Sequence, residues 1–104
     1  MKLFEKITAA RDILELPERA TRKQIKANYR RLLREWHPDR GTRADKEIRE
    51  RRTRQIIEAY RIIRTYCDNY RYSFTEEEVR NYLSGEEWWM ERFGTTTPGG
   101  KSNP

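Results

Sequence analysis

The sequence predicts an all-α protein: an antiparallel helical hairpin with a short N-terminal helix, a short fourth helix and an aromatic C-terminal segment. Three observations lead to this fold class. Only 5 of the 104 residues are Gly and 4 are Pro, while Arg, Glu and Ile are common, and such a composition favours helices. Two stretches repeat apolar residues at helical spacing. One stretch of about eight residues, rich in Pro, Gly, Asp and Arg, separates them.

The N-terminal helix is expected over residues 8–16. Its apolar anchors are Ile13, Leu14 and Leu16, and Pro17 is expected to end it because proline cannot continue a helix. This helix is therefore available to pack along the hairpin.

The first long helix of the hairpin is expected over residues 22–36. Thr21 precedes it, and its hydroxyl can accept from the Gln24 amide while the Gln24 side chain reaches back, as in a capping box. The apolar positions form one stripe along the helix. They are Ile25, Tyr29, Leu32, Leu33 and Trp36.

A third, longer helix is expected over residues 45–69, and it completes the hairpin. Its stripe follows a 3-4-3-4 spacing. The stripe consists of Thr53, Ile56, Tyr60, Ile63 and Cys67. A second capping box, Thr75 to Glu78, predicts a short fourth helix that ends near residue 83.

The chain is expected to divide into a helical domain over residues 1–83, an aromatic segment over 84–94 and a disordered tail over 95–104. The aromatic segment holds Trp88, Trp89 and Phe93, which are candidates either for the core or for a docking patch. The tail is rich in Thr, Gly and Pro, a composition typical of disorder.

Charge and cysteine content narrow the function classes. The formal net charge is +6 and the isoelectric point is near 9.7, so an acidic partner is expected: nucleic acid, an anionic membrane or an acidic protein face. The single cysteine, Cys67, excludes an internal disulfide and a multi-cysteine zinc site. The N-terminal residues contain no long apolar run, so neither a signal peptide nor a membrane span is predicted. We expect a cytoplasmic monomer without a cofactor.

The only histidine lies in the motif His37-Pro38-Asp39, and three interpretations compete: a catalytic pair, a metal ligand or a recognition tip. Catalysis is disfavoured because Asp39 is poorly placed to orient His37, and the serines all lie far downstream. One His and one Cys on different elements cannot supply the ligands that zinc requires. We therefore expect neither an enzyme nor a metal site.

A structural role for the motif stays open beside recognition. Pro38 can simply end the helix, His37 can interact with the helix dipole, and Asp39 can cap the turn.

The residues around this motif resemble the J-domain, the co-chaperone module of the DnaJ proteins. The resemblance covers about residues 8–65 and rests on "ATRKQIKANYRRLLREWHPDR" and on "QIIEAYRII". It implies binding to ATP-loaded, DnaK-type heat-shock chaperones, stimulation of their ATP hydrolysis and closure of the chaperone on its client. The positions that match the functional motif of the family are His37, Pro38 and Asp39, together with basic residues of the second helix.

Those basic residues share one helix face, opposite the apolar stripe. Lys23, Lys26, Arg30 and Arg34 are spaced by 3, 4 and 4 residues, and Arg22 and Arg31 flank them. Such a face is either a solvated surface or a complement to an acidic groove on the chaperone. Beside the loop motif, we favour the second interpretation.

The chain also departs from the family. Arg11 and Thr53 stand where many J-domains carry aromatic residues, so Phe4 or a C-terminal aromatic residue is expected to replace the missing volume. The sequence holds no Gly/Phe-rich linker and no Cys-x-x-Cys zinc domain. Independent client holding is therefore in doubt, and service to one chaperone or a narrow task is expected, with the client unidentified.

A basic helical nucleic-acid-binding domain is the alternative function. The basic isoelectric point and an arginine-rich third helix allow it. The arginines are Arg49, Arg51, Arg52, Arg54, Arg61 and Arg64. Acidic residues alternate with them, and the loop between the long helices is longer than the turn of a helix-turn-helix, so this alternative is the weaker one.

Tryptophan fluorescence tests the aromatic segment. Each buried aromatic side chain contributes on the order of 2–3 kcal/mol, so we expect part of this segment to fold back near the Arg11/Thr53 end of the helices. In a variant whose Trp36 is replaced, native emission should then lie at shorter wavelength than emission after denaturation. A fully solvent-like native emission would instead indicate an exposed docking patch.

Overall fold

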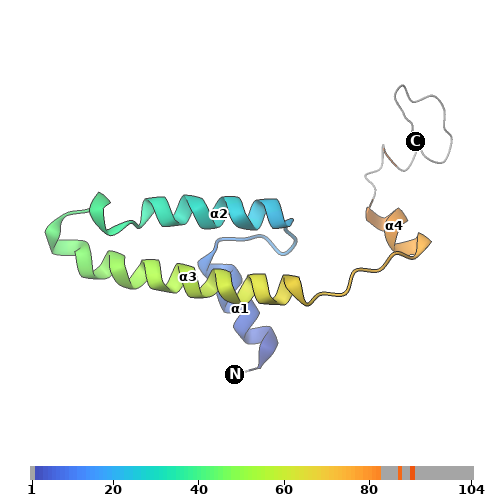
Figure 1. Cartoon of the computed structure of the whole chain (residues 1–104), viewed down its shortest axis with the longest axis horizontal. Helices are drawn as coiled ribbons and strands as arrows, with labels where there is room; N and C mark the ends of the chain where they lie inside the picture. The colour runs from blue at the N-terminus through green and yellow to red at the C-terminus, as the bar shows by residue number, and fades with distance from the viewer. Residues whose placement is uncertain (1, 83–86, 88–89, 91–104) are drawn as a thin grey trace. The chain divides into compact units, whose positions relative to one another are not determined.

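The computed structural model describes residues 2–82, 87 and 90, and its elements are helical throughout that part of the chain (Figure 1). They are α1 (Leu3–Ile13), α2 (Arg22–Glu35), the 3₁₀ turns η1 (Pro38–Arg40) and η2 (Arg43–Asp45), α3 (Lys46–Asp68) and α4 (Glu76–Tyr82). The residues form two compact units, with the division between Tyr70 and Arg71. In the described helices, none is both long and apolar enough to cross a membrane.

The all-α class and the hairpin are confirmed. Helices α2 and α3 run side by side in opposite directions, joined by the two 3₁₀ turns, and α1 packs against α3 (Figure 1). Two sequence predictions lie outside the described residues: the placement of the aromatic side chains Trp88, Trp89 and Phe93, and the tail over 95–104.

The core of the first unit lies between the three helices. Tyr29 of α2 and Tyr60 of α3 stack with ring centroids 3.9 Å apart and planes within 4° of parallel, so they fix the register of the hairpin. Of the ten side chains in the two predicted stripes, Ile25, Leu32, Ile56 and Ile63 are buried and the other six are half-buried. The buried core comprises Ala10, Leu14, Leu16, Ile25, Leu32, Ile56, Ala59 and Ile63.

Helix α2 begins at the predicted capping box. The Gln24 N–H donates to the Thr21 hydroxyl at 3.1 Å, and the Thr21 N–H donates to the Gln24 side chain at 2.7 Å. At the start of α4 the Glu78 N–H donates to the Thr75 hydroxyl at 3.3 Å. Both threonines therefore cap helices, as their sequence contexts predicted.

The predicted bounds of the first helix are wrong at both ends. Helix α1 begins at Leu3, where the Glu5 carboxylate accepts from the Lys2 N–H at 3.3 Å. It ends at Ile13 rather than at Leu16, because Glu15 adopts a left-handed conformation with φ of 56°. The Glu15 and Leu16 N–H groups then donate to carbonyls of the last helical turn, which is the hydrogen-bond pattern of a Schellman motif.

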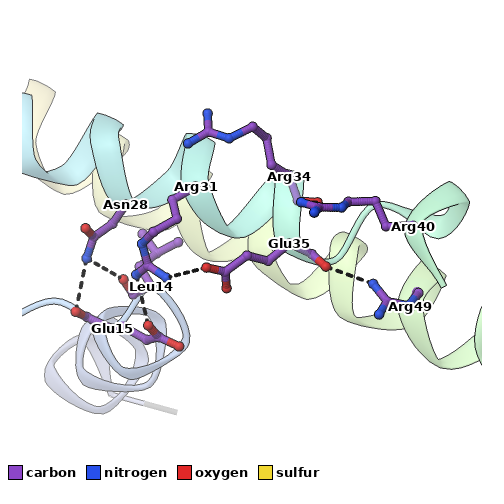
Figure 2. A network of polar contacts seen from close by, with 8 residues as sticks. All are labelled: Leu14, Glu15, Asn28, Arg31, Arg34, Glu35, Arg40 and Arg49. Carbon is purple, nitrogen blue, oxygen red and sulfur yellow. Dashed lines mark hydrogen bonds and ion pairs between the residues drawn. The ribbon is translucent and has the colours of Figure 1, made fainter.

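A left-handed glutamate at this turn is strained, and α2 compensates for the strain. The Asn28 amide donates to the carbonyls of Leu14 and Glu15 at 3.0 and 3.1 Å, and Arg31 pairs with the Glu15 carboxylate at 2.9 Å (Figure 2). The turn after α1 is thus tied to the middle of α2, and these bonds fix the position of Leu16, which is buried.

Arg11 and Thr53 stand where many J-domains carry aromatic residues, and the structure does not replace the missing rings with Phe4 as expected. Phe4 does not replace the missing volume, since it is 78% exposed. Arg11 is half-buried and borders a small hollow of about 130 Å³ beside Leu16, Ile63 and Cys67. At the other position, the Thr53 hydroxyl donates to the Trp36 carbonyl at 3.0 Å, so a hydrogen bond takes the place of ring packing.

Truncating the fully buried core residues should destabilise the protein strongly. Leu32 and Ile56 are 1% and 0% exposed, so Leu32→Ala and Ile56→Ala should each lower the free energy of unfolding by about 2–5 kcal/mol. Denaturant unfolding measures this change. Ile57→Ala is the matched control, because Ile57 is 48% exposed and its loss should cost under about 0.5 kcal/mol. Unchanged unfolding for both core variants would contradict the packing described here.

Candidate functional site

The site begins where α2 ends, because the last carbonyls of a helix have no partners within it. Three side chains from the loop and from α3 supply those partners. Arg40 donates to the Arg34 carbonyl at 3.2 Å, Arg49 to the Glu35 carbonyl at 2.8 Å, and Thr53 to the Trp36 carbonyl at 3.0 Å. Figure 2 shows the Arg49 contact that joins α3 to the end of α2. The loop is therefore anchored at its first residues.

Arg49 contacts the loop at several points. Besides the Glu35 carbonyl, it contacts the Asp45 carboxylate at 3.3 Å, and its guanidinium carbon lies 5.6 Å from the centroid of the Trp36 ring. Gly41 packs against it so closely that a Cβ there would lie 2.1 Å from the Arg49 Nε atom. Only glycine permits this approach without displacing the arginine.

The motif His37-Pro38-Asp39 lies at the apex, on the η1 turn. The His37 Nδ1 atom accepts from the Asp39 N–H at 3.1 Å, and the Arg40 N–H donates to the His37 carbonyl at 2.9 Å. His37 is therefore the residue that caps the turn, and the interpretation that gave this role to the Asp39 side chain is wrong. The Asp39 side chain is 88% exposed.

This geometry does not suit a catalytic pair. The Nδ1 lone pair is occupied by a backbone N–H, and the Asp39 carboxylate is 3.8 Å from Nδ1, beyond hydrogen-bond distance. Asp39 therefore does not orient the ring as the acid of a triad does. Among the described residues, no group of three or more His, Cys, Asp and Glu side chains is arranged to hold a metal ion. The apex instead presents an exposed carboxylate on a fixed turn.

The basic residues of α2 fall into two groups that their spacing did not separate. Lys23, Lys26, Arg30 and Arg34 are exposed, and their side chains form no salt bridge with any described residue. Figure 2 shows the Arg34 side chain extending away from the other labelled side chains. We call these four residues the open basic face.

The other group is engaged within the fold. Arg22 donates to the Asp68 carboxylate of α3 at 2.9 Å. Arg31 pairs with Glu15 at 2.9 Å and with Glu35 at 3.0 Å (Figure 2). Its hydrogen bonds to Glu15 and then Glu35 raise the pKa of the Arg31 guanidinium above its ordinary value. These contacts connect α2 to its neighbours, so neither arginine is as available to a partner as the open basic face.

Helix α3 adds one residue that the sequence interpretation did not place here. Arg64 lies 5.9 Å from the centroid of the Tyr60 ring and borders a recess of about 440 Å³ together with Lys23 and Lys26. The floor of this recess includes Ile25 and Cys67. The spacing of Tyr60 and Arg64, one helical turn apart, is the only signal in the sequence that could have indicated this position.

Comparison with known proteins identifies the family to which this chain belongs. The family model "DnaJ domain" matches residues 4–72. A chaperone protein DnaJ of Thermotoga petrophila is 46% identical over 52 residues, which is 50% of this chain and 14% of that protein. DnaJ homolog subfamily B member 3 of Homo sapiens is 40% identical over 52 residues, 50% of this chain and 35% of that protein.

A third relative matches over a longer stretch. DnaJ homolog subfamily B member 2 of Homo sapiens is 31% identical over 74 residues, which is 71% of this chain and 22% of that protein. The chain thus spans roughly a third or less of each of these relatives. No solved structure matches the chain significantly. Since the family model covers well over half of its residues, and the hairpin carries His37-Pro38-Asp39 at its apex, this chain belongs to the DnaJ-domain family.

Proposed function

We propose that this protein is a co-chaperone that binds the ATP-bound state of a DnaK-type heat-shock chaperone and stimulates its ATP hydrolysis. One observation carries the proposal: a fixed turn exposes the Asp39 carboxylate at the end of the same helix that bears the open basic face. Together they present two complementary kinds of charge to one partner. The membership in the DnaJ-domain family supports the assignment.

The open basic face is proposed to steer and orient the protein as it associates with the chaperone. Four exposed cations on successive turns of α2 complement an acidic groove, and such complementarity raises association rates and sets orientation. Because these side chains are not held by carboxylates of the described residues, they can pair with the chaperone without first breaking an internal contact.

The apex gives the contact its specificity. Asp39 is proposed to meet a cation of the chaperone, while Pro38 and the His37 Nδ1 bond keep the turn in one conformation. A carboxylate presented by a preorganised turn loses little conformational freedom on binding. We propose that the protein acts as a monomer and that the client is held by the chaperone.

Direct nucleic-acid binding gains no support from the arrangement of the α3 arginines. Arg49 and Arg52 lie over the Trp36 ring, and Arg61 pairs with Glu58. Of the remaining arginines of α3, Arg51 and Arg54 border one recess and Arg64 borders another. A phosphate backbone would require them along one continuous surface.

Changes at the apex should remove activity without unfolding the protein. Asp39→Asn keeps the size of the side chain and deletes its charge, and His37→Gln deletes the ring. We expect either variant to reduce stimulation of steady-state ATP hydrolysis by a DnaK-type chaperone at least about ten-fold, as expected for loss of one charged contact, while the melting temperature changes little. Asp12→Asn, at another exposed aspartate, is the matched control. Full stimulation by both apex variants would contradict the proposal.

The two groups of basic residues should respond differently to substitution. Arg30→Ala should weaken binding to the chaperone modestly, and the difference from the wild-type protein should shrink in high salt because the charge is exposed. Arg31→Ala should instead lower the melting temperature, since it removes the contacts with Glu15 and Glu35. Titration of chaperone binding at two salt concentrations, beside thermal unfolding, separates these effects. Equal behaviour of the two variants would contradict the division of the basic residues.

Arg49 should position the apex without contacting the chaperone. Arg49→Ala removes the hydrogen bond to the Glu35 carbonyl and the contact with Trp36, so we expect it to lower the free energy of unfolding by about 1–2 kcal/mol. Amide hydrogen exchange should accelerate over residues 37–45 more than in the middle of α2. Arg49→Lys should be intermediate because lysine lacks the planar fork. Uniform acceleration along the chain would indicate a purely global role.

A further inference from the structure

A groove between α1 and α3 lies away from the residues proposed to bind the chaperone. It has a volume of about 400 Å³ and is lined by residues of these two helices. None of its lining residues belongs to α2 or to the loop with His37-Pro38-Asp39. What binds there can therefore be tested independently of the co-chaperone function.

The groove is apolar because small residues line it where the two helices pack. Ala9 and Ala10 of α1 and Ala59 of α3 line it; Ala10 and Ala59 are only 2% exposed and form its floor, whereas Ala9 is exposed at its edge. Ile13 and Ile62 border it and pack against the core. Alanine methyl groups in place of larger side chains leave a hollow that apolar side chains of suitable size can fill.

Positive charge surrounds this apolar floor. Lys6, Arg51 and Arg54 line the groove, and both arginines are exposed and form no salt bridge with any described residue. The acidic lining residue is Glu58, to which Arg61 donates a hydrogen bond at 3.1 Å. That hydrogen bond, aided by the charges of Arg61 and Lys6, lowers the pKa of Glu58, so its carboxylate stays ionised and engaged.

We propose that this groove binds an acidic amphipathic helix of a partner protein. Apolar side chains on one stripe of the helix would lie on the alanine floor between Ile13 and Ile62, as in other helix-in-groove complexes. Glu or Asp side chains beside the stripe would pair with Arg51 and Arg54, whose guanidinium groups match carboxylates bidentately.

The chemistry of the lining favours such a helix over other acidic partners. A nucleic acid would leave the apolar floor without a counterpart, and the lining holds no aromatic ring on which a base could stack. A lipid surface requires large apolar side chains that project outward, whereas the apolar lining here consists of three alanines and the half-buried Ile13 and Ile62. A protein helix supplies both the protruding apolar groups and the flanking carboxylates.

A designed peptide provides the test. The probe is a fluorescein-labelled peptide of about 20 residues, above the length of about 12–15 residues at which isolated helices are marginal in water, with Leu along one stripe and Glu beside it. A second peptide carries Lys at every Glu position. With the full 104-residue chain and no chaperone present, fluorescence anisotropy should show binding of the acidic peptide and at least about ten-fold weaker binding of the basic one.

Three variants locate the binding. The double variant Arg51→Glu/Arg54→Glu should weaken binding of the acidic peptide at least about ten-fold. Ala9→Gln, at an exposed α1 position, should also weaken this binding because it places a polar side chain over the floor of the groove. Lys23→Glu/Lys26→Glu changes the net charge equally but on α2, and it should leave binding nearly unchanged. Thermal unfolding confirms that each variant is folded.

Several outcomes would overturn the proposal. They are equal binding of the two peptides, equal weakening by the α2 variant, and absence of binding up to about 1 mM acidic peptide. Amide chemical-shift changes confined to α2 rather than to Ala9, Ala59 and Ile62 would also overturn it. Because the assay contains no chaperone, a negative result leaves the co-chaperone proposal untouched. Conversely, the ATPase stimulation measured for the apex variants does not bear on the proposal that the groove binds an acidic helix.

Discussion

A helix cannot satisfy its own last carbonyl groups, and this constraint organises the end of α2 and the apex that follows it. The carbonyls of the last two residues of α2 and of Trp36, which follows them, accept from Arg40, Arg49 and Thr53. Arg49 and Thr53 are one turn apart on α3, so one face of that helix supplies both donors. The end of α2, the loop and the start of α3 are thereby joined, and the position of the exposed Asp39 carboxylate follows from this junction.

The same residue type has three different roles in this basic protein. Arg40 and Arg49 satisfy carbonyls around the apex, and Arg22 and Arg31 bridge helices through carboxylates. On α2, the side chains of the open basic face are the basic groups that are not paired with a carboxylate of the described residues, so they can pair with a partner. A net charge of +6 is therefore not a uniform field. The exposed cations without a salt bridge to any described residue include the open basic face on α2 and, separately, Arg51 and Arg54 on the rim of the groove between α1 and α3.

The departures from the family pattern have local structural consequences. Where many J-domains carry an aromatic residue in the third helix, Thr53 here donates a hydrogen bond to Trp36, and Arg49 and Arg52 lie over the Trp36 ring. Where the first helix often carries an aromatic residue, Arg11 leaves a small hollow at its side. The hairpin thus tolerates the loss of ring packing at one end because polar contacts at the apex replace it.

The sequence by itself determined the helical class, the hairpin, the capping box at Thr21 and the position of His37-Pro38-Asp39. These features depend on periodicity, on proline and on contacts between residues close in the chain. It did not determine where α1 ends, because the left-handed Glu15 is held by Asn28 and Arg31, more than ten residues away. Nor could it separate the open arginines of α2 from the bridging ones, since spacing on one helix does not show which carboxylates another segment brings near. Only tertiary packing decided those partners.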